Sequence, residues 1–327
     1  MAYEIHPWKV IETGFEPDKM RLSESLTSTG NGYMGMRGNF EEDYSGDTHL
    51  GTYIGGVWFP DKTRVGWWKN GYPQYFGKVI NAVRLNGIHV EINGKPLDLA
   101  KADVLDFRRE LDMQTGIFSR HFTLWTPNGK IEVKAERFVS LAQKELLAVN
   151  YSITPEFEAD IVMKPYLDAN VRNLDSNYDE TFWDMLQEEQ TEDALALLTK
   201  TKENPFGAPR FAVAAGLSCW SDQLELKERK LDEGYVEDAL EQGDFRGVPL
   251  TIGRTFAYLP SMPHDSRQLL QEQRRVLRAL AAHGDCIIVG RCADHVLESK
   301  HVDCLSLFIC APFDWRVHHR MEIENVD

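Results

Sequence analysis

The feature that most constrains this chain is an alternation of apolar and polar residues over residues 75–155. The segment IHVEINGK places Ile88, Val90 and Ile92 on one face of a strand and ends in an Asn93-Gly94 turn. The same period recurs around later turns, with apolar residues at Phe122, Leu124, Ile131, Val133, Leu147, Val149, Tyr151 and Ile153. Alternation bounded by Gly, Asn and Pro is typical of half-buried antiparallel strands. The first part of the chain is therefore predicted to form an antiparallel β-sandwich.

Residues 30–75 precede these strands and are rich in Gly, Trp and Tyr, which predicts long ordered loops with short strands. The segment GNGYMG matches a dinucleotide-binding pattern at Gly30, Gly32 and Gly35. That pattern requires a buried strand before it and a helix after it. A polar stretch precedes it here and Gly38 follows, so we do not assign a nucleotide site to it.

Composition limits the classes of partner. The chain has 327 residues, 43% of them hydrophobic, and a formal charge of −15. This charge repels nucleic acid and anionic membrane surfaces, so neither is an expected partner. No apolar run reaches the length of a membrane helix, and the N-terminus lacks the pattern of a secretory signal. We expect a cytoplasmic protein with reduced thiols.

The segment RLSESLTSTGNGYMGMRGNFEEDYSGDTHLGTYIGGVW resembles the start of the N-terminal domain of glycoside hydrolase family 65. The resemblance continues through GWWKNGYPQYFGKVINA and DANVRNLDSNYDETFW and covers about residues 1–215. The family contains disaccharide phosphorylases, among which the maltose phosphorylase type is most similar. The resemblance implies a galactose mutarotase-like β-sandwich, which full-length members join to an (α/α)6 barrel.

In that family the catalytic glutamate and the ligands of inorganic phosphate lie in the barrel. The sequence departs from the family before the barrel begins, so the resemblance assigns no catalytic residue to it. No cofactor or metal is expected, and inorganic phosphate is a co-substrate of the family. We therefore expect that the chain alone neither phosphorolyses maltose nor acts as a complete enzyme.

Aromatic residues in VGWWKNGYPQYF are the candidates for carbohydrate contact. Trp67, Trp68 and Tyr72, with Tyr75 nearby, offer ring faces that pack on sugars. The alternative is that they pack loops onto the sandwich or into a homodimer interface. The acidic stretch 156–193 is predicted to be a solvated connector with a surface helix at DETFWDMLQEEQ.

The second part of the chain has a different pattern. SDQLELKERKLDEGYVEDALEQ, residues 221–242, is charged and is predicted to be helical. HDSRQLLQEQRRVLRALAAHG is predicted to be a helix that Asp265 caps and Gly284 ends. CIIVG, RCADHVLESK and CLSLFICA then read as strand, helix and strand, a βαβ unit.

Four of the five cysteines lie in this βαβ unit, at Cys286, Cys292, Cys304 and Cys310, and the fifth is Cys219. Tetrahedral metal sites usually have pairs separated by two to four residues, and these spacings are wider. Burial as reduced core residues is favoured over a zinc site, and a zinc site over a disulfide.

The segments IIVGRCAD and APFDWRVHHR resemble the cytidylate kinase-like family over about residues 230–325. The resemblance implies that Arg291 approaches the phosphate of a nucleoside monophosphate, that Asp294 is a further polar contact, and that Arg316 and Arg320 face donor phosphates. The alternative is that Arg291 pairs with a surface carboxylate. The sequence contains no G-x-x-x-x-G-K-[ST] loop, which such kinases need.

We thus predict a join: a family 65 β-sandwich domain over 1–215, a junction over 216–231, and a partial P-loop-kinase-like α/β fragment over 232–327. Three functions remain open. The first is a phosphorylase-family protein with possible binding of a small carbohydrate and dimerisation. The second is a nucleotide-kinase relative, and the third is a non-enzymatic interaction protein.

Overall fold

The computed structural model describes residues 2–63, 73–174, 180–191, 194–245 and 250–261. These residues belong to one compact unit, Met1–Ser261. The unit is mainly β, with one 3-10 helix, η1 (Pro17–Lys19), and one short α-helix, α1 (Met20–Leu26), among the described residues. None of the helices described is long and apolar enough to cross a membrane.

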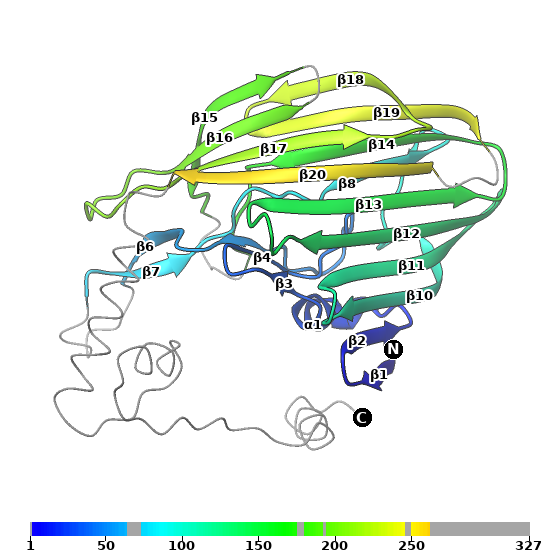
Figure 1. Ribbon diagram of the computed structural model, residues 1–327, viewed down its shortest axis with the longest axis horizontal. Coiled ribbons are helices and arrows are strands. Elements are labelled where there is room, and N and C mark those ends of the chain that lie inside the picture. Colours follow the sequence, from blue (N-terminus) through cyan, green and yellow to red (C-terminus); the bar gives the residue numbers. More distant parts are fainter. Residues whose placement is uncertain (1, 64–72, 175–179, 192–193, 246–249, 262–327) are drawn as a thin grey trace. The chain divides into compact units, whose positions relative to one another are not determined.

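Ten strands form the larger sheet. Five neighbours in it, β10, β11, β12, β13 and β20, lie side by side in Figure 1 as green to yellow arrows. In spatial order the ten strands are β1 (Ala2–His6), β2 (Lys9–Thr13), β10 (Asp103–Asp112), β11 (Ile117–Thr126), β12 (Gly129–Val139), β13 (Leu146–Pro155), β20 (Leu250–Ser261), β17 (Ala212–Trp220), β16 (Leu195–Thr201) and β15 (Trp183–Gln190). Every pairing in the sheet is antiparallel.

Five strands form a second antiparallel sheet, in the order β18 (Glu225–Asp232), β19 (Tyr235–Phe245), β14 (Ala159–Asp168), β8 (Ile88–Ile92) and β9 (Lys95–Pro96). Two small sheets contain β3 (Thr29–Gly30), β4 (Met34–Met36) and β5 (Thr52–Ile54), and β6 (Trp58–Lys62) and β7 (Tyr75–Val79). The GNGYMG segment lies in the β3–β4 hairpin, so it lacks the helix that a dinucleotide site requires.

The core lies between the two main sheets. One buried cluster joins Leu147 and Val213 of the larger sheet to Leu167 and Val236 of the smaller one. A second cluster joins residues of β11, β12 and β13 to residues of β8, β14 and β19, among them Phe122, Val133, Ile153, Val90, Met163 and Leu240. The two sheets therefore pack face to face, and each buries the apolar side of its strands.

The alternation over residues 75–155 is confirmed as antiparallel strands. Ile88, Val90, Phe122 and Ile131 are each at most 1% exposed, as expected for their side of the strand. The Asn93-Gly94 turn joins β8 to β9 with φ angles of 51° and 71°, which glycine and asparagine tolerate best. The prediction of a mainly β, antiparallel first part is thus correct for the described residues.

Two helix predictions are wrong. The segment DETFWDMLQEEQ contains β15 at the edge of the larger sheet, and residues 221–242 contain β18 and most of β19. Each strand pairs with a neighbour along its length, β15 with β16 and β18 with β19, and this pairing decides the conformation over local charge. Strands β17, β18, β19 and β20 span or follow residue 215, so the change of pattern near this residue does not end the sheets.

Candidate functional site

Most of the site residues predicted from sequence lie outside the described residues. This holds for the aromatic residues Trp67, Trp68 and Tyr72, for Arg291, Asp294, Arg316 and Arg320, and for Cys286, Cys292, Cys304 and Cys310. The carbohydrate, nucleotide and core-packing roles given to them stay predictions. Tyr75 and Cys219 are described: Tyr75 stacks on Trp58, with ring centroids 6.2 Å apart, and Cys219 lies in β17.

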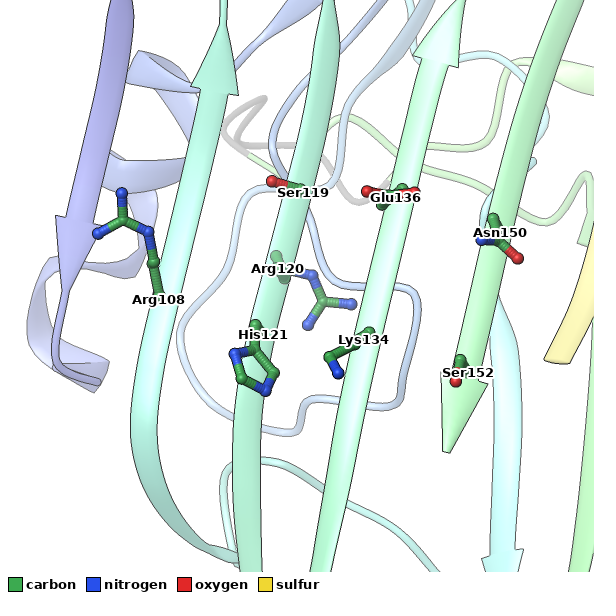
Figure 2. A pocket seen from close by; sticks show the side chains of 8 residues that line it. All are labelled: Arg108, Ser119, Arg120, His121, Lys134, Glu136, Asn150 and Ser152. Carbon is green, nitrogen blue, oxygen red and sulfur yellow. The ribbon is translucent and has the colours of Figure 1, made fainter. Parts of the chain in front are cut away.

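A polar cavity of about 410 Å³ lies on the solvent side of the larger sheet, over four neighbouring strands from β10 to β13. Its lining residues, which Figure 2 shows, are Arg108, Ser119, Arg120, His121, Lys134, Glu136, Asn150 and Ser152. All but Arg120 occupy the strand positions that alternate with the buried ones. Strand register therefore builds this site from residues far apart in sequence.

The register places these residues in two rows across the strands. Ser119, Glu136 and Asn150 are successive Cα partners on β11, β12 and β13. In the adjacent row, His121 pairs with Arg108 on one side and Lys134 on the other. Directly opposed side chains on one face lie about 5 Å apart at Cβ, close enough to contact one ligand together.

Each cationic group in this cavity has a carboxylate partner. Arg108 lies 2.8 Å from Glu110 and 3.1 Å from Glu4. Lys134 and His121 lie 3.0 and 2.7 Å from Glu132. A hydrogen bond from Lys134 lowers the pKa of Glu132, so that carboxylate stays charged and neutralises Lys134. The cavity therefore offers little net attraction to an anion such as phosphate.

A second cavity of about 460 Å³ adjoins the first and shares Glu136 and Asn150 with it. It adds the apolar side chains Ile117, Phe138 and Trp220. The turn after β17 contributes the polar residues Ser221, Asp222 and Gln223. Because the two cavities share these residues, we refer to them together as the outer groove, which is polar at the β10 end and mixed at the Trp220 end.

Three buried arginines lie on the opposite face of the same strands. Arg109, Arg120 and Arg137 are each at most 2% exposed. Arg120 Nη2 lies 2.6 Å from Glu42 Oε2 and also pairs with Glu41.

The third arginine ties the loop that carries these carboxylates to the sheet. Arg137 pairs with Glu41 and donates hydrogen bonds to the carbonyl oxygens of Asn39 and Arg37, over 2.7 and 2.8 Å. These contacts fix residues 37–42 beneath the outer groove.

The electrostatics of this cluster follow from its burial. Burial by itself raises the pKa of the Glu41 carboxyl, but Arg137 and Arg120 offset this and lower it to about 2. Arg120 lies over the Phe40 ring at 4.8 Å, and Arg137 over the Phe118 ring at 4.2 Å. The charges of Arg120, Arg137, Glu41 and Glu42 are paired within the protein, so the cluster holds residues 37–42 against the sheet.

Sequence reasoning missed both the groove and the arginine cluster. The cluster had a visible signal, because Arg120 stands between Phe118 and Phe122 on the side of β11 that the alternation predicts to be buried. The groove had a weaker one, since polar residues at outward positions are common on any sheet. Its composition suits hydrogen bonding to a neutral ligand. Among the described residues, no three His, Cys, Asp or Glu side chains are placed to hold a metal ion.

Comparison with known proteins identifies the family. Residues 10–285 match the model for "Glycosyl hydrolase family 65, N-terminal domain". The chain is 48% identical over 237 residues to the maltose phosphorylase of Bacillus subtilis, covering 72% of this chain and 31% of that protein. It is 28% identical over 285 residues to the alpha,alpha-trehalose phosphorylase of Thermoanaerobacter brockii, covering 82% and 36%.

A solved structure shows the same fold. A human-microbiome protein described as a kojibiose phosphorylase matches with a TM-score of 0.72 at 24% identity, over 90% of this chain and 37% of that one. The chain thus spans about a third of the length of these relatives. The family match also extends into the stretch compared with cytidylate kinases, and these comparisons give no support to a kinase-like fragment. The chain belongs to glycosyl hydrolase family 65, of which it carries the N-terminal domain, and is related to its disaccharide phosphorylases.

Proposed function

We propose that this chain supplies the N-terminal domain of a disaccharide phosphorylase that acts on maltose and inorganic phosphate. The observation that carries the proposal is the 48% identity to a maltose phosphorylase over 237 residues. Relatives that are phosphorylases of trehalose, nigerose and kojibiose are 26–30% identical to this chain. The maltose type is therefore the best-supported substrate class.

The geometry supports a non-catalytic role for the described residues. Phosphorolysis needs a carboxylic acid that protonates the leaving oxygen and a cationic site that holds phosphate at the anomeric carbon. In the outer groove the cations Arg108 and Lys134 are paired with carboxylates, and His121 contacts Glu132. The chemistry is accordingly assigned to the barrel that the family joins to this domain.

A domain exchange tests this proposal. The aligned region of the Bacillus subtilis maltose phosphorylase is replaced by the aligned residues of this chain, and glucose 1-phosphate formation from maltose and phosphate is measured. We expect the chimera to retain activity on maltose. A control exchange into the Thermoanaerobacter brockii trehalose phosphorylase, where identity is 28%, should retain much less activity on trehalose. A folded but inactive maltose chimera would overturn the proposal.

The chain alone provides a second test. Incubated with maltose and phosphate, it should form no glucose 1-phosphate, and with ATP, magnesium and CMP it should form no CDP. Turnover in the first assay would place the catalytic site within this chain, against the proposal. Turnover in the second would favour the kinase alternative predicted from Arg291.

A further inference from the structure

The exposed indole of Trp220 lies at one end of the outer groove. Trp220 is the last residue of β17, and its side chain is 56% exposed. Across the sheet it pairs with Gly253, which in turn pairs with Asn150. Glycine has no side chain, so none stands at this position between Trp220 and Asn150. An exposed indole can pack against the apolar face of a sugar ring.

The floor of the groove presents hydrogen-bonding groups that are not used inside the protein. The side chains of Ser119, Glu136, Asn150 and Ser152 are half-exposed or exposed, and none has a hydrogen bond or ion pair with another described residue. They supply hydroxyl, carboxylate and amide groups along two adjacent rows. A ligand with many hydroxyl groups can satisfy several of them at once.

The charges select a neutral ligand. The basic residues that line the groove have carboxylate partners: Arg108 pairs with Glu4 and Glu110, Lys134 with Glu132, and the buried Arg120 and Arg137 with Glu41. Two further carboxylates, Glu136 and Asp222, line the groove without a cationic partner among the described residues. An anionic ligand would meet these carboxylates, and the whole chain carries a formal charge of −15.

The length of the groove favours an oligosaccharide over a disaccharide as the ligand. Ser119 and Trp220 lie on β11 and β17, which are separated in the sheet by β12, β13 and β20. Four interstrand spacings amount to about 19 Å. This exceeds the length of a disaccharide, so a ligand that reaches from one end to the other has several sugar units.

We propose that the outer groove binds a linear, neutral α-linked glucan oligosaccharide. One sugar ring stacks on Trp220, and hydroxyl groups of neighbouring units bond to Asn150, Glu136 and Ser119. Only the choice of an α-linked glucan rests on the proposed function; the groove itself rests on its geometry and charge.

The experiment is calorimetric titration of the full chain with maltoheptaose, compared with Trp220→Ala and Asn150→Ala. We expect Trp220→Ala to weaken binding at least about tenfold, which corresponds to about 1.4 kcal/mol. Asn150→Ala should weaken it several-fold. The matched control is Trp125→Ala. Trp125 is 53% exposed on the same face of β11 but lines neither cavity, so its loss should leave binding unchanged.

Several outcomes would overturn this site. They are absence of maltoheptaose binding, equal loss with Trp125→Ala and Trp220→Ala, and equal binding of cellohexaose. A dimer of the chain that Trp220→Ala dissociates would show that the groove is an interface between copies instead. Thermal melts of each variant confirm that the fold is intact. The titration measures binding by the chain itself, whereas the domain exchange measures phosphorolysis by a chimera. A negative result in either experiment therefore does not change the conclusion from the other.

Discussion

Two regions of the larger sheet use the same alternation but bury different chemistry. Around Arg120, strands β10 to β12 turn three arginines inward, where they pair with Glu12, Glu41 and Glu42. Around Leu197, strands β16 and β17 turn inward only small and aliphatic side chains and threonine, such as Val213, Ala215 and Thr199. The first region holds a loop against the sheet, and the second joins two sheets through apolar contact.

Apolar burial and ionic burial stabilise the sheet under different conditions. Apolar burial is non-directional, so the Leu197 region depends on volume and on little else. Buried ions are stable only when every partner is present, because an unpaired charge cannot be solvated there. The arginine region therefore fixes residues 37–42 in one position under the outer groove, at the cost of sensitivity to substitution and pH.

The largest effect is expected when the ionic region loses one arginine. Arg120→Met leaves Glu41 and Glu42 buried with fewer partners, and it should lower the free energy of unfolding by about 3–5 kcal/mol. Urea denaturation measures this. The matched control is Arg108→Met on β10, whose half-exposed ion pairs should be worth at most about 1 kcal/mol. Similar losses for both variants would contradict the distinction between buried and exposed pairs.

A pH-dependent effect is expected for Glu41. Its pKa in the folded state is about 2 against an ordinary 4.5, a difference that corresponds to about 3 kcal/mol of stability. Because the folded pKa is the lower one, this contribution is fully present above pH 4.5 and disappears as the pH falls toward 2. Glu41→Gln should thus be less stable than the wild type near neutral pH and approach it in acid. If the difference in unfolding free energy between Glu41→Gln and the wild type stayed the same in acid, the ion pairs of Glu41 would not be its cause.

A smaller and pH-independent effect is expected in the apolar region. Val213→Ala removes two buried methyl groups from a fully buried position and should cost about 2 kcal/mol. The same urea series across pH provides the measurement. If this variant followed the pH profile of Glu41→Gln, the two regions would not be independent.

The smallest effect is expected on the solvent side of the ionic region. Asn150→Ala changes an exposed side chain with no partner among the described residues, so its stability should stay within about 0.5 kcal/mol of the wild type. Differential scanning calorimetry tests this. A larger loss would mean that Asn150 holds the sheet together and does not serve the groove.

Much of the β architecture could be predicted, because alternation states directly which side of a strand is buried. The inward positions of Phe122, Ile131 and Ile153 followed from their neighbours, and all three are at most 1% exposed. The failures at residues 179–190 and 221–242 have one cause. Their helix-like charge patterns are local, whereas β15 and β18 form because a partner strand elsewhere supplies hydrogen bonds.

The candidate site was hardly predictable. The outer groove exists only where Ser119, Glu136, Asn150 and Trp220 meet across strands that are far apart in sequence. The pairing register of the strands brings these residues together. A shift of one residue in that register would turn every side chain of a strand to the other face. The aromatic and arginine residues chosen from sequence, Trp67 and Arg291 among them, lie outside the described residues and stay predictions.

The sequence by itself determined the family and the faces of the central strands, because motif similarity and period-two burial are properties of local order. Only the tertiary structure decided that Arg109, Arg120 and Arg137 are core residues. Their charge favours solvent, and their inward position is tolerable only because Glu12, Glu41 and Glu42, distant in the chain, reach the same buried layer. The free energy of a buried charge depends on its partners in space, which no stretch of sequence specifies alone.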